Sequence, residues 1–117
     1  MQNTHSKGES GERVAEKFLT EKGFRLIERN YRYERGEIDL IFDDHGILVF
    51  VEVKTRRSET YGEPEDAITP RKRRQIRKVA EAYLWVKNIK DTECRFDVVA
   101  IKWESGKAKI NYIPNAF

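Results

Sequence analysis

The chain has 117 residues, of which 38% are hydrophobic and 37% charged, so it can bury the core of one compact domain but is too short for two. Its 23 Lys and Arg against 20 Asp and Glu leave a net charge of only +3, which excludes a uniform positive field that would hold a polyanion. One cysteine and two scattered histidines exclude an internal disulfide, a cysteine-based zinc cluster and a histidine metal site, so any metal site must be built from carboxylates.

The N-terminal segment is polar up to Val14, and no segment approaches the roughly 20 apolar residues that a membrane span needs. These features predict a cytoplasmic protein without a membrane partner. We expect residues 1–7 to form a flexible N-terminus and residues 8–117 to form a single domain.

The first predicted element is a helix that runs from Ser10, its predicted N-cap, to Lys22, with Gly23 as its C-terminal stop. Its apolar stripe consists of Val14, Ala15, Phe18 and Leu19. A strand is predicted next, over Phe24–Tyr31. The residues Asn30–Arg35 are predicted to form a polar, basic connector.

Residues Gly36–Lys54 contain two apolar β-runs joined by the turn-forming cluster Asp43–Gly46, which predicts one hairpin. If Phe42 and Ile47 flank the turn, one face of this hairpin is wholly apolar. That face carries Ile38, Leu40, Phe42, Val49, Val51 and Val53. The opposite face carries Glu37, Asp39, Ile41, Leu48, Phe50, Glu52 and Lys54. Three carboxylates and one ammonium group therefore share a surface with strong strand-forming residues.

Carboxylates on neighbouring strands repel each other, so Asp39 and Glu52 indicate a cation between them. Oxygen ligands from two strands suit Mg²⁺, with Mn²⁺ as a substitute. Lys54 points to the same side, where it can orient or deprotonate an attacking water. The alternative is a solvated edge of an amphipathic hairpin. Because Glu52 and Lys54 interrupt an apolar run that should lie in a buried sheet, the pattern favours a site.

These residues carry a family resemblance. Asp39, followed after a hairpin by Glu52-Val53-Lys54, resembles the Asp…Glu-x-Lys signature of the PD-(D/E)XK nuclease superfamily, which includes restriction endonucleases and archaeal Holliday junction resolvases. The blocks Gly36–Ile41 and Phe50–Arg56, with Gly11-Glu12 upstream, are similar to the YraN family, which is predicted to be endonuclease-like. The resemblance extends from about Gly8 to Ile101. It implies a restriction-endonuclease-like αβββαβ core, an α/β fold in which a mixed sheet is flanked by helices.

The resemblance also implies an activity, that of a metal-dependent DNA endonuclease acting on branched or structured DNA. Asp39 and Glu52 would hold one or two Mg²⁺, and Lys54 would activate the attacking water. By analogy with the resolvases, Glu12 of the first helix would complete the ligand set, and Glu37 would assist in orienting the ligands. From its position alone, Glu12 is a helix-start glutamate that complements the helix dipole.

A second helix is predicted from Thr69, with Pro70 at its first position, to about Lys87. Its apolar stripe consists of Ile76, Val79, Ala80, Tyr83 and Leu84. Lys72 falls on the stripe side of the first turn, so it must either snorkel to the solvent or find a carboxylate or a phosphate, with Gln75 as the alternative accessory residue.

Six of the eight residues Arg71–Lys78 are basic. Helical projection places one group of them opposite the stripe, together with Trp85. The basic members of this group are Arg71, Arg74 and Lys78. They suit contact with DNA phosphates or a partner surface, and an ordinary solvated face is the alternative. Arg56 and Arg57 would likewise contact phosphate in a nuclease, although a surface pair is equally consistent with the sequence.

The C-terminal part is predicted to form a central strand over Arg95–Trp103 and an edge strand over Lys109–Ile113. Asp97 is predicted to be structural, paired with Arg95 or with a loop.

Two other functions remain open, namely a non-catalytic nucleic-acid-binding module on the same fold and a protein-interaction domain. A homodimer is the expected working unit, because branched DNA needs two cuts related by a two-fold axis. Four aromatic residues could supply its contact surface, or they could close the core of a monomer. They are Trp85, Trp103, Tyr112 and Phe117.

Overall fold

The computed structural model describes residues 6–57 and 68–117, with the side chains of residues 6–9 and of Arg57 left out. The elements follow in the order helix, three strands, helix, two strands. They are α1 (Ser6–Glu21), β1 (Arg25–Tyr33), β2 (Gly36–Asp44), β3 (Ile47–Arg57), α2 (Pro70–Val86), β4 (Cys94–Glu104) and β5 (Lys107–Ile113). In the described ranges, no helix is long and apolar enough to cross a membrane.

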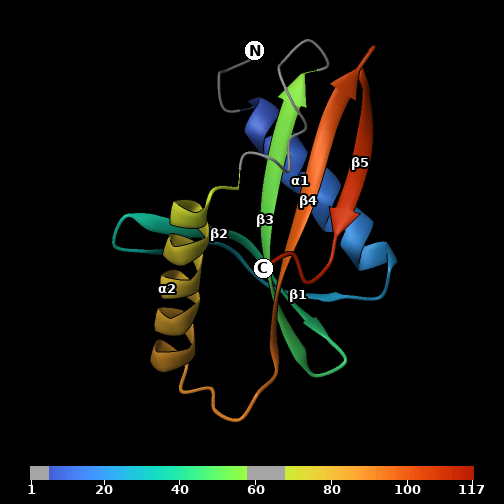
Figure 1. Cartoon of the computed structure of the whole chain (residues 1–117). Helices are drawn as coiled ribbons and strands as arrows, with labels where there is room; N and C mark the ends of the chain where they lie inside the picture. Colours follow the sequence, from blue (N-terminus) through green and yellow to red (C-terminus); the bar gives the residue numbers. More distant parts are fainter. Residues whose placement is uncertain (1–5, 58–67) are drawn as a thin grey trace.

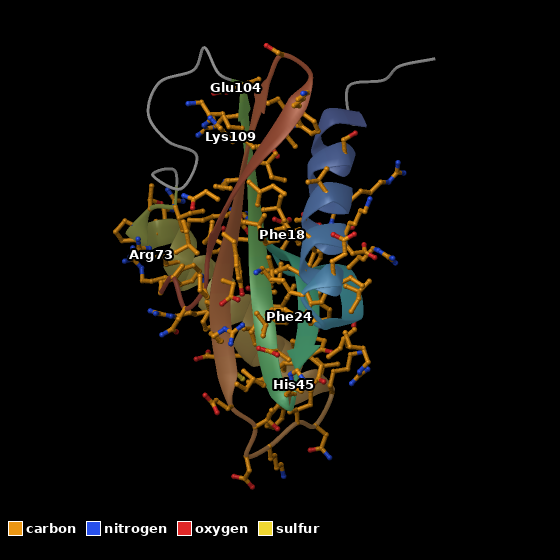
Figure 2. The ribbon with its side chains drawn as sticks, turned by 90° about the vertical axis from the view of Figure 1, so that its right-hand side faces the viewer. Phe18, Phe24, His45, Arg73, Glu104 and Lys109 are labelled. Atoms are coloured by element: carbon orange, nitrogen blue, oxygen red, sulfur yellow. The ribbon has the colours of Figure 1, made fainter. Side chains whose placement is uncertain are left out.

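The five strands form one mixed sheet in the order β1-β2-β3-β4-β5. All neighbouring strands are antiparallel except β3 and β4, which are parallel and are connected through α2. The predicted α/β architecture is confirmed, since the sheet is flanked by two helices in a manner compatible with a restriction-endonuclease-like core (Figure 1). Figure 2 shows the helices on opposite sides of the strands, with Phe18 on the α1 side and Arg73 on the α2 side.

Each face of the sheet has its own hydrophobic cluster. On the α1 side, Ala15 and Leu19 pack against the apolar residues of the hairpin and of β4. On the α2 side, the helix packs over the first half of β3 and over β2. The α2 residues in this cluster are Ile76, Val79, Ala80 and Tyr83, which belong to the predicted stripe. The approach of α2 to β2 depends on Gly36, because a Cβ there would lie 2.5 Å from Val79 Cγ2.

The first helix begins earlier than its sequence predicts. It starts at Ser6 instead of at the expected N-cap Ser10, so the last two residues of the expected flexible segment 1–7 belong to it. Residues 1–5 lie outside the described part of the chain. At the other end Gly23 adopts φ +101°, and its N–H donates to the Thr20 carbonyl at 2.9 Å. The predicted helix stop is therefore confirmed.

The connector predicted over Asn30–Arg35 is wrong. β1 continues to Tyr33, which pairs with Gly36, so only Glu34 and Arg35 connect β1 and β2. The polar composition of the segment is that of a loop, but a two-residue turn is enough because Glu34 takes a left-handed conformation with φ 55°.

The hairpin of β2 and β3 also differs in register from the expected one. Its turn consists of only His45 and Gly46, both with positive φ, and Phe42 pairs with Val49 instead of with Ile47. A slip of two residues keeps the same side chains on the same face, because side chains alternate with a period of two. The apolar face assignment therefore survives the wrong register from Leu40 onwards, whereas Ile38 lies on the other face.

The second helix begins and ends as predicted. The Thr69 hydroxyl accepts a hydrogen bond from Lys72 N at 3.1 Å, Pro70 is the first helical residue, and the helix ends at Val86. This N-cap sets the start of the helix and thereby fixes which side chain of its first turn faces the sheet.

Asp97 is fully buried and fully hydrogen-bonded, which confirms its structural role. It accepts two hydrogen bonds from Arg95 at 2.9 and 3.0 Å, one from the Tyr112 hydroxyl at 2.6 Å and one from Asn115 N at 2.9 Å. Phe117 stacks on Phe96 with ring centroids 5.2 Å apart. Tyr112 and Phe117 therefore close the core instead of offering a contact surface, and Trp103 is also half-buried.

Candidate active site

The candidate site lies where β2 and β3 separate. Their pairing ends at Leu40 and Val51. The part of β2 that precedes Leu40 in the chain lies away from β3 and towards α2 (Figure 1). The N–H of Val53 would continue the ladder, but it donates instead to the Asp39 carboxylate, Oδ2, at 2.8 Å. The Asp39 side chain thus occupies the fork between the two strands.

The alternation of side chains along β2 changes at the same point. Leu40 and Phe42 belong to the cluster on the α1 side, and Ile41 belongs to the cluster on the α2 side. Regular alternation would put Ile38 with Leu40, as the sequence predicts, but Ile38 packs in the α2-side cluster. That prediction is wrong, because Ile38 and Leu40 pack on opposite faces of the sheet although only Asp39 separates them.

Glu52 extends from β3 on the α2 side and is only 6% exposed. Two ammonium groups approach the same carboxylate oxygen, Oε2, with Lys54 Nζ at 3.7 Å and Lys72 Nζ at 3.8 Å. Lys54 follows Glu52 on the same face of β3, and Lys72 comes from the first turn of α2. The structure therefore brings together four of the predicted site residues, namely Asp39, Glu52, Lys54 and Lys72.

The electrostatics of the two carboxyl groups are unusual. Burial, followed by repulsion from Glu52, raises the pKa of Asp39 to about 8, against the effect of the Val53 hydrogen bond. Burial also raises the pKa of Glu52, against the opposing charges of Lys72 and Lys54. Without a cation, the pair therefore retains a proton at neutral pH.

Glu12 and Glu37 lie at the margin of this pair. Repulsion from each of them contributes to the raised pKa of Asp39, which places both within electrostatic reach. Glu12 comes from the α1 side and Glu37 from β2, where Arg32 Nε lies 3.6 Å from its carboxylate. Within the described residues, no three Asp, Glu, His or Cys side chains stand close enough to form a complete metal-binding group.

The two central carboxylates nevertheless fit a magnesium ion. Mg²⁺ is commonly held by one or two carboxylates and keeps several water ligands, so a three-residue protein cage is not required. A divalent cation would also remove the repulsion that raises the pKa of Asp39. The donor chemistry is that of two hard oxygen ligands, as expected from the sequence.

The other predicted residues occupy different places. Gln75 donates its side-chain amide to the Arg35 carbonyl at 3.3 Å, so it contacts the β1–β2 turn instead of the site. Arg56 lies half-buried near the end of β3, and the Arg57 side chain lies outside the described part.

The basic residues of α2 divide into three groups. Lys72 reaches Glu52, and Arg73 and Arg77 lie over the ring of Phe117 at 5.7 and 5.5 Å. The third group faces solvent, and its Lys78 lies 3.7 Å from Glu34. It consists of Arg71, Arg74 and Lys78, which are all exposed. Trp85 is 86% exposed near the end of the same helix.

Asn30 is a residue of the site region that the sequence pattern did not predict. It lies in β1 with φ 52°, and its side-chain amide donates to the Glu12 carboxylate, Oε1, at 3.1 Å. Both residues line a cleft of about 790 Å³ between α1 and β1, together with Leu40. An asparagine inside a predicted strand is the signal that could have indicated a left-handed residue there.

Comparison with known proteins shows one family. Residues 11–101 match the model of the uncharacterised protein family UPF0102. A UPF0102 protein of Symbiobacterium thermophilum is 48% identical over 94% of this chain and 94% of its own length. Relatives from Chlorobium phaeobacteroides and Syntrophomonas wolfei are 47% and 48% identical over 88% and 92% of this chain, and over 81% and 93% of their own lengths.

Proposed function

The chain belongs to the uncharacterised protein family UPF0102, the YraN family, and we propose that it is a metal-dependent DNA endonuclease. The observation that carries the proposal is the Asp39–Glu52 pair in the strand fork, with Lys54 3.7 Å from Glu52. Burial of two carboxylates and a lysine beside each other is unfavourable for stability alone, and such an arrangement is typical of a catalytic centre.

Each residue has a role that follows from its position. Asp39 and Glu52 would hold the cation, with Glu12 approaching from the α1 side. Mg²⁺ would supply charge stabilisation to the phosphodiester and would lower the pKa of an attacking water. Lys54, half-buried beside Glu52, would orient that water, and in its neutral amine form it would take up the proton that the water loses on attack. Lys72 would balance the charge of Glu52 and contact the phosphate.

Phosphodiester hydrolysis in DNA is the reaction that these groups support best. The exposed basic residues on α2 begin next to Lys72, so phosphates along this helix would lead to the site. A DNA substrate would place the protein in the cytoplasm. In a single-stranded or branched segment, one DNA strand could reach the fork between β2 and β3 directly. Structured DNA is therefore the first substrate to test.

The test is cleavage of a panel of single-stranded, duplex, flap and four-way-junction DNAs in Mg²⁺, in Mn²⁺ and in chelator. Cleavage of at least one substrate, only with a divalent cation, supports the proposal. Binding without cleavage of any substrate would instead favour the non-catalytic DNA-binding module. Neither binding nor cleavage would favour a protein-interaction domain.

DNA binding is expected to depend on the exposed face of α2. Charge reversal at Arg71, Arg74 and Lys78 should flatten the slope of log affinity against log salt by about 0.9 for each phosphate that the helix no longer binds. The measurement is a salt series in chelator, so that cleavage does not interfere. Lys109→Glu, an exposed charge on the edge strand β5, is the matched control and should leave the slope unchanged. If the triple variant has the same slope as the wild type, α2 does not bind the phosphates, and Arg32–Arg35 or Arg56–Arg57 become the next candidates for the DNA contact.

The homodimer stays a prediction, and fewer exposed aromatic residues support it than the sequence suggested. Of the four aromatic residues that could supply its contact surface, only Trp85 is largely exposed, next to Val86 at 60%. Sedimentation at micromolar concentration, with and without DNA, would decide, and a mass near 13.8 kDa in both cases would contradict the dimer.

A further inference from the structure

We propose that Asn30 is a positioning residue of the candidate site, which sets both the direction of Asp39 through its backbone and the direction of Glu12 through its side chain. This inference rests on the proposed function, because it assigns Asn30 to the cation site. Asn30 is not part of the Asp…Glu-x-Lys signature, and its side-chain amide bonds to Glu12, whereas the Asp39 carboxylate accepts from Val53.

The backbone of Asn30 is left-handed, with φ 52°, in the middle of β1. The pairs on either side of it are Arg29 with Leu40 and Tyr31 with Ile38, so Asn30 lies opposite Asp39. A left-handed residue is rare in a strand, and asparagine adopts this conformation more readily than most residues. The left-handed residue of β1, which is separate from the register shift between Leu26 and Glu28, therefore lies directly beside Asp39.

This coincidence explains how Asp39 leaves the regular alternation of β2. A left-handed residue locally increases the twist of a strand pair, as a β-bulge does. At this level β2 separates from β3, Ile38 turns to the α2 side, and the Asp39 carboxylate accepts from Val53 N at 2.8 Å. We infer that the conformation of Asn30 holds β2 in the shape that directs Asp39 into the fork.

The side chain of Asn30 holds the third carboxylate. Its amide donates to Glu12 Oε1 at 3.1 Å, and Glu12 lies within electrostatic reach of Asp39. The neighbouring Glu16 is held differently, by two hydrogen bonds from Arg29 at 2.8 and 2.9 Å. An arginine neutralises the carboxylate that it holds, whereas a neutral amide orients a carboxylate and leaves its charge available for a cation. The contact of Asn30 with Glu12 is therefore appropriate for a carboxylate that binds a cation. The contact of Arg29 with Glu16 is appropriate for a carboxylate with a structural role.

The test separates the backbone of Asn30 from its side chain. Asn30→Gly keeps the left-handed conformation but removes the amide, whereas Asn30→Ala removes the amide and also strains that conformation. Asn88, exposed after α2 with φ 56°, offers the matched control Asn88→Gly, because it is a left-handed asparagine away from the carboxylates. Mn²⁺ is titrated calorimetrically into each full-length variant.

Asn30→Gly is expected to weaken Mn²⁺ binding about tenfold, since partners that orient metal ligands typically contribute roughly 10–100-fold. Glu12→Gln should weaken it by a similar factor, and the double variant should bind no more weakly than Glu12→Gln alone. Asn88→Gly should bind as the wild type does. Wild-type affinity in Asn30→Gly, or fully additive losses in the double variant, would overturn the role of the side chain.

A second measurement needs no cation, so it decides about Asn30 even if the wild type binds none and the proposed function fails. In chelator, the losses in melting temperature of Asn30→Gly and Glu12→Ala should be less than additive, because both remove the same hydrogen bond. Asn30→Ala should melt about 3–6 °C below Asn30→Gly, owing to the strain of a left-handed alanine. Additive losses, or equal melting of the alanine and glycine variants, would contradict the proposal.

Discussion

Asn in place of Asp39 is expected to abolish cation-dependent DNA cleavage while leaving the protein folded. The amide keeps an oxygen that can accept the hydrogen bond of Val53 N, but it loses the negative charge that would hold the cation. Lys54→Met should lower the cleavage rate by about 10²–10⁴-fold, the usual contribution of a proton-transfer group. The measurement is single-turnover cleavage of whichever DNA of the panel the wild type cuts.

Lys109→Met is the control for removing a lysine, because Lys109 lies on the edge strand β5 and pairs with Glu104 at 3.6 Å. This variant should cleave at the wild-type rate. Full activity in Asp39→Asn or in Lys54→Met would show that the reaction does not use this site. Loss of activity together with loss of the folded state would be uninformative, so each variant is checked by its melting temperature, which Asp39→Asn should not lower above neutral pH.

The stability of the cation-free protein should fall as the pH rises, and Asp39→Asn should remove the part of this fall that is due to Asp39. Burial and Glu52 raise the pKa of Asp39 from 3.8 to about 8 in the folded state. The folded protein therefore keeps a proton that the unfolded chain releases. The stability associated with this proton is fully present below pH 3.8 and is lost as the pH rises to about 8.

The expected loss is about 1.4 kcal/mol in the free energy of unfolding for each pH unit in this window, or several kcal/mol in total as an upper estimate. Urea unfolding in chelator between about pH 5 and about pH 9 measures it. The difference between Asp39→Asn and the wild type should grow with pH in favour of the variant. Asp43→Asn, in the same strand but at its far end, controls for the loss of one carboxylate. If the difference in the free energy of unfolding between Asp39→Asn and the wild type stays constant across this pH range, the ionisation of Asp39 does not destabilise the folded protein.

Much of the fold follows from local patterns that the sequence displays. The family membership predicted from Gly36–Ile41 and Phe50–Arg56 is confirmed, as are the mixed sheet and the start of α2 at Thr69 and Pro70. The turn predicted from Asp43 onwards begins too early, because Asp43 and Asp44 are turn-forming residues that here belong to a strand. Propensity could not identify them, since their strand conformation is imposed by pairing with β3.

The candidate site was predictable in its residues but not in its shape. The identity and spacing of Asp39, Glu52 and Lys54 pointed to one surface, and helical projection pointed to Lys72. The separation of β2 from β3, the reversal at Ile38 and the hydrogen bond from Asn30 to Glu12 depend on contacts between elements distant in sequence. A regular period of two, which is the basis for reading strands, cannot reveal the point at which a strand stops being regular.

The most direct test of the central claim is calorimetric titration of Mg²⁺ into the wild type at about pH 7, in buffers of different ionisation enthalpy. Because the pKa of Asp39 is raised to about 8, a cation bound by Asp39 and Glu52 must displace a proton. The expected result is saturable binding that releases about one proton and that is lost in Asp39→Asn. Absence of binding, or binding that releases no proton and persists in Asp39→Asn, would contradict it.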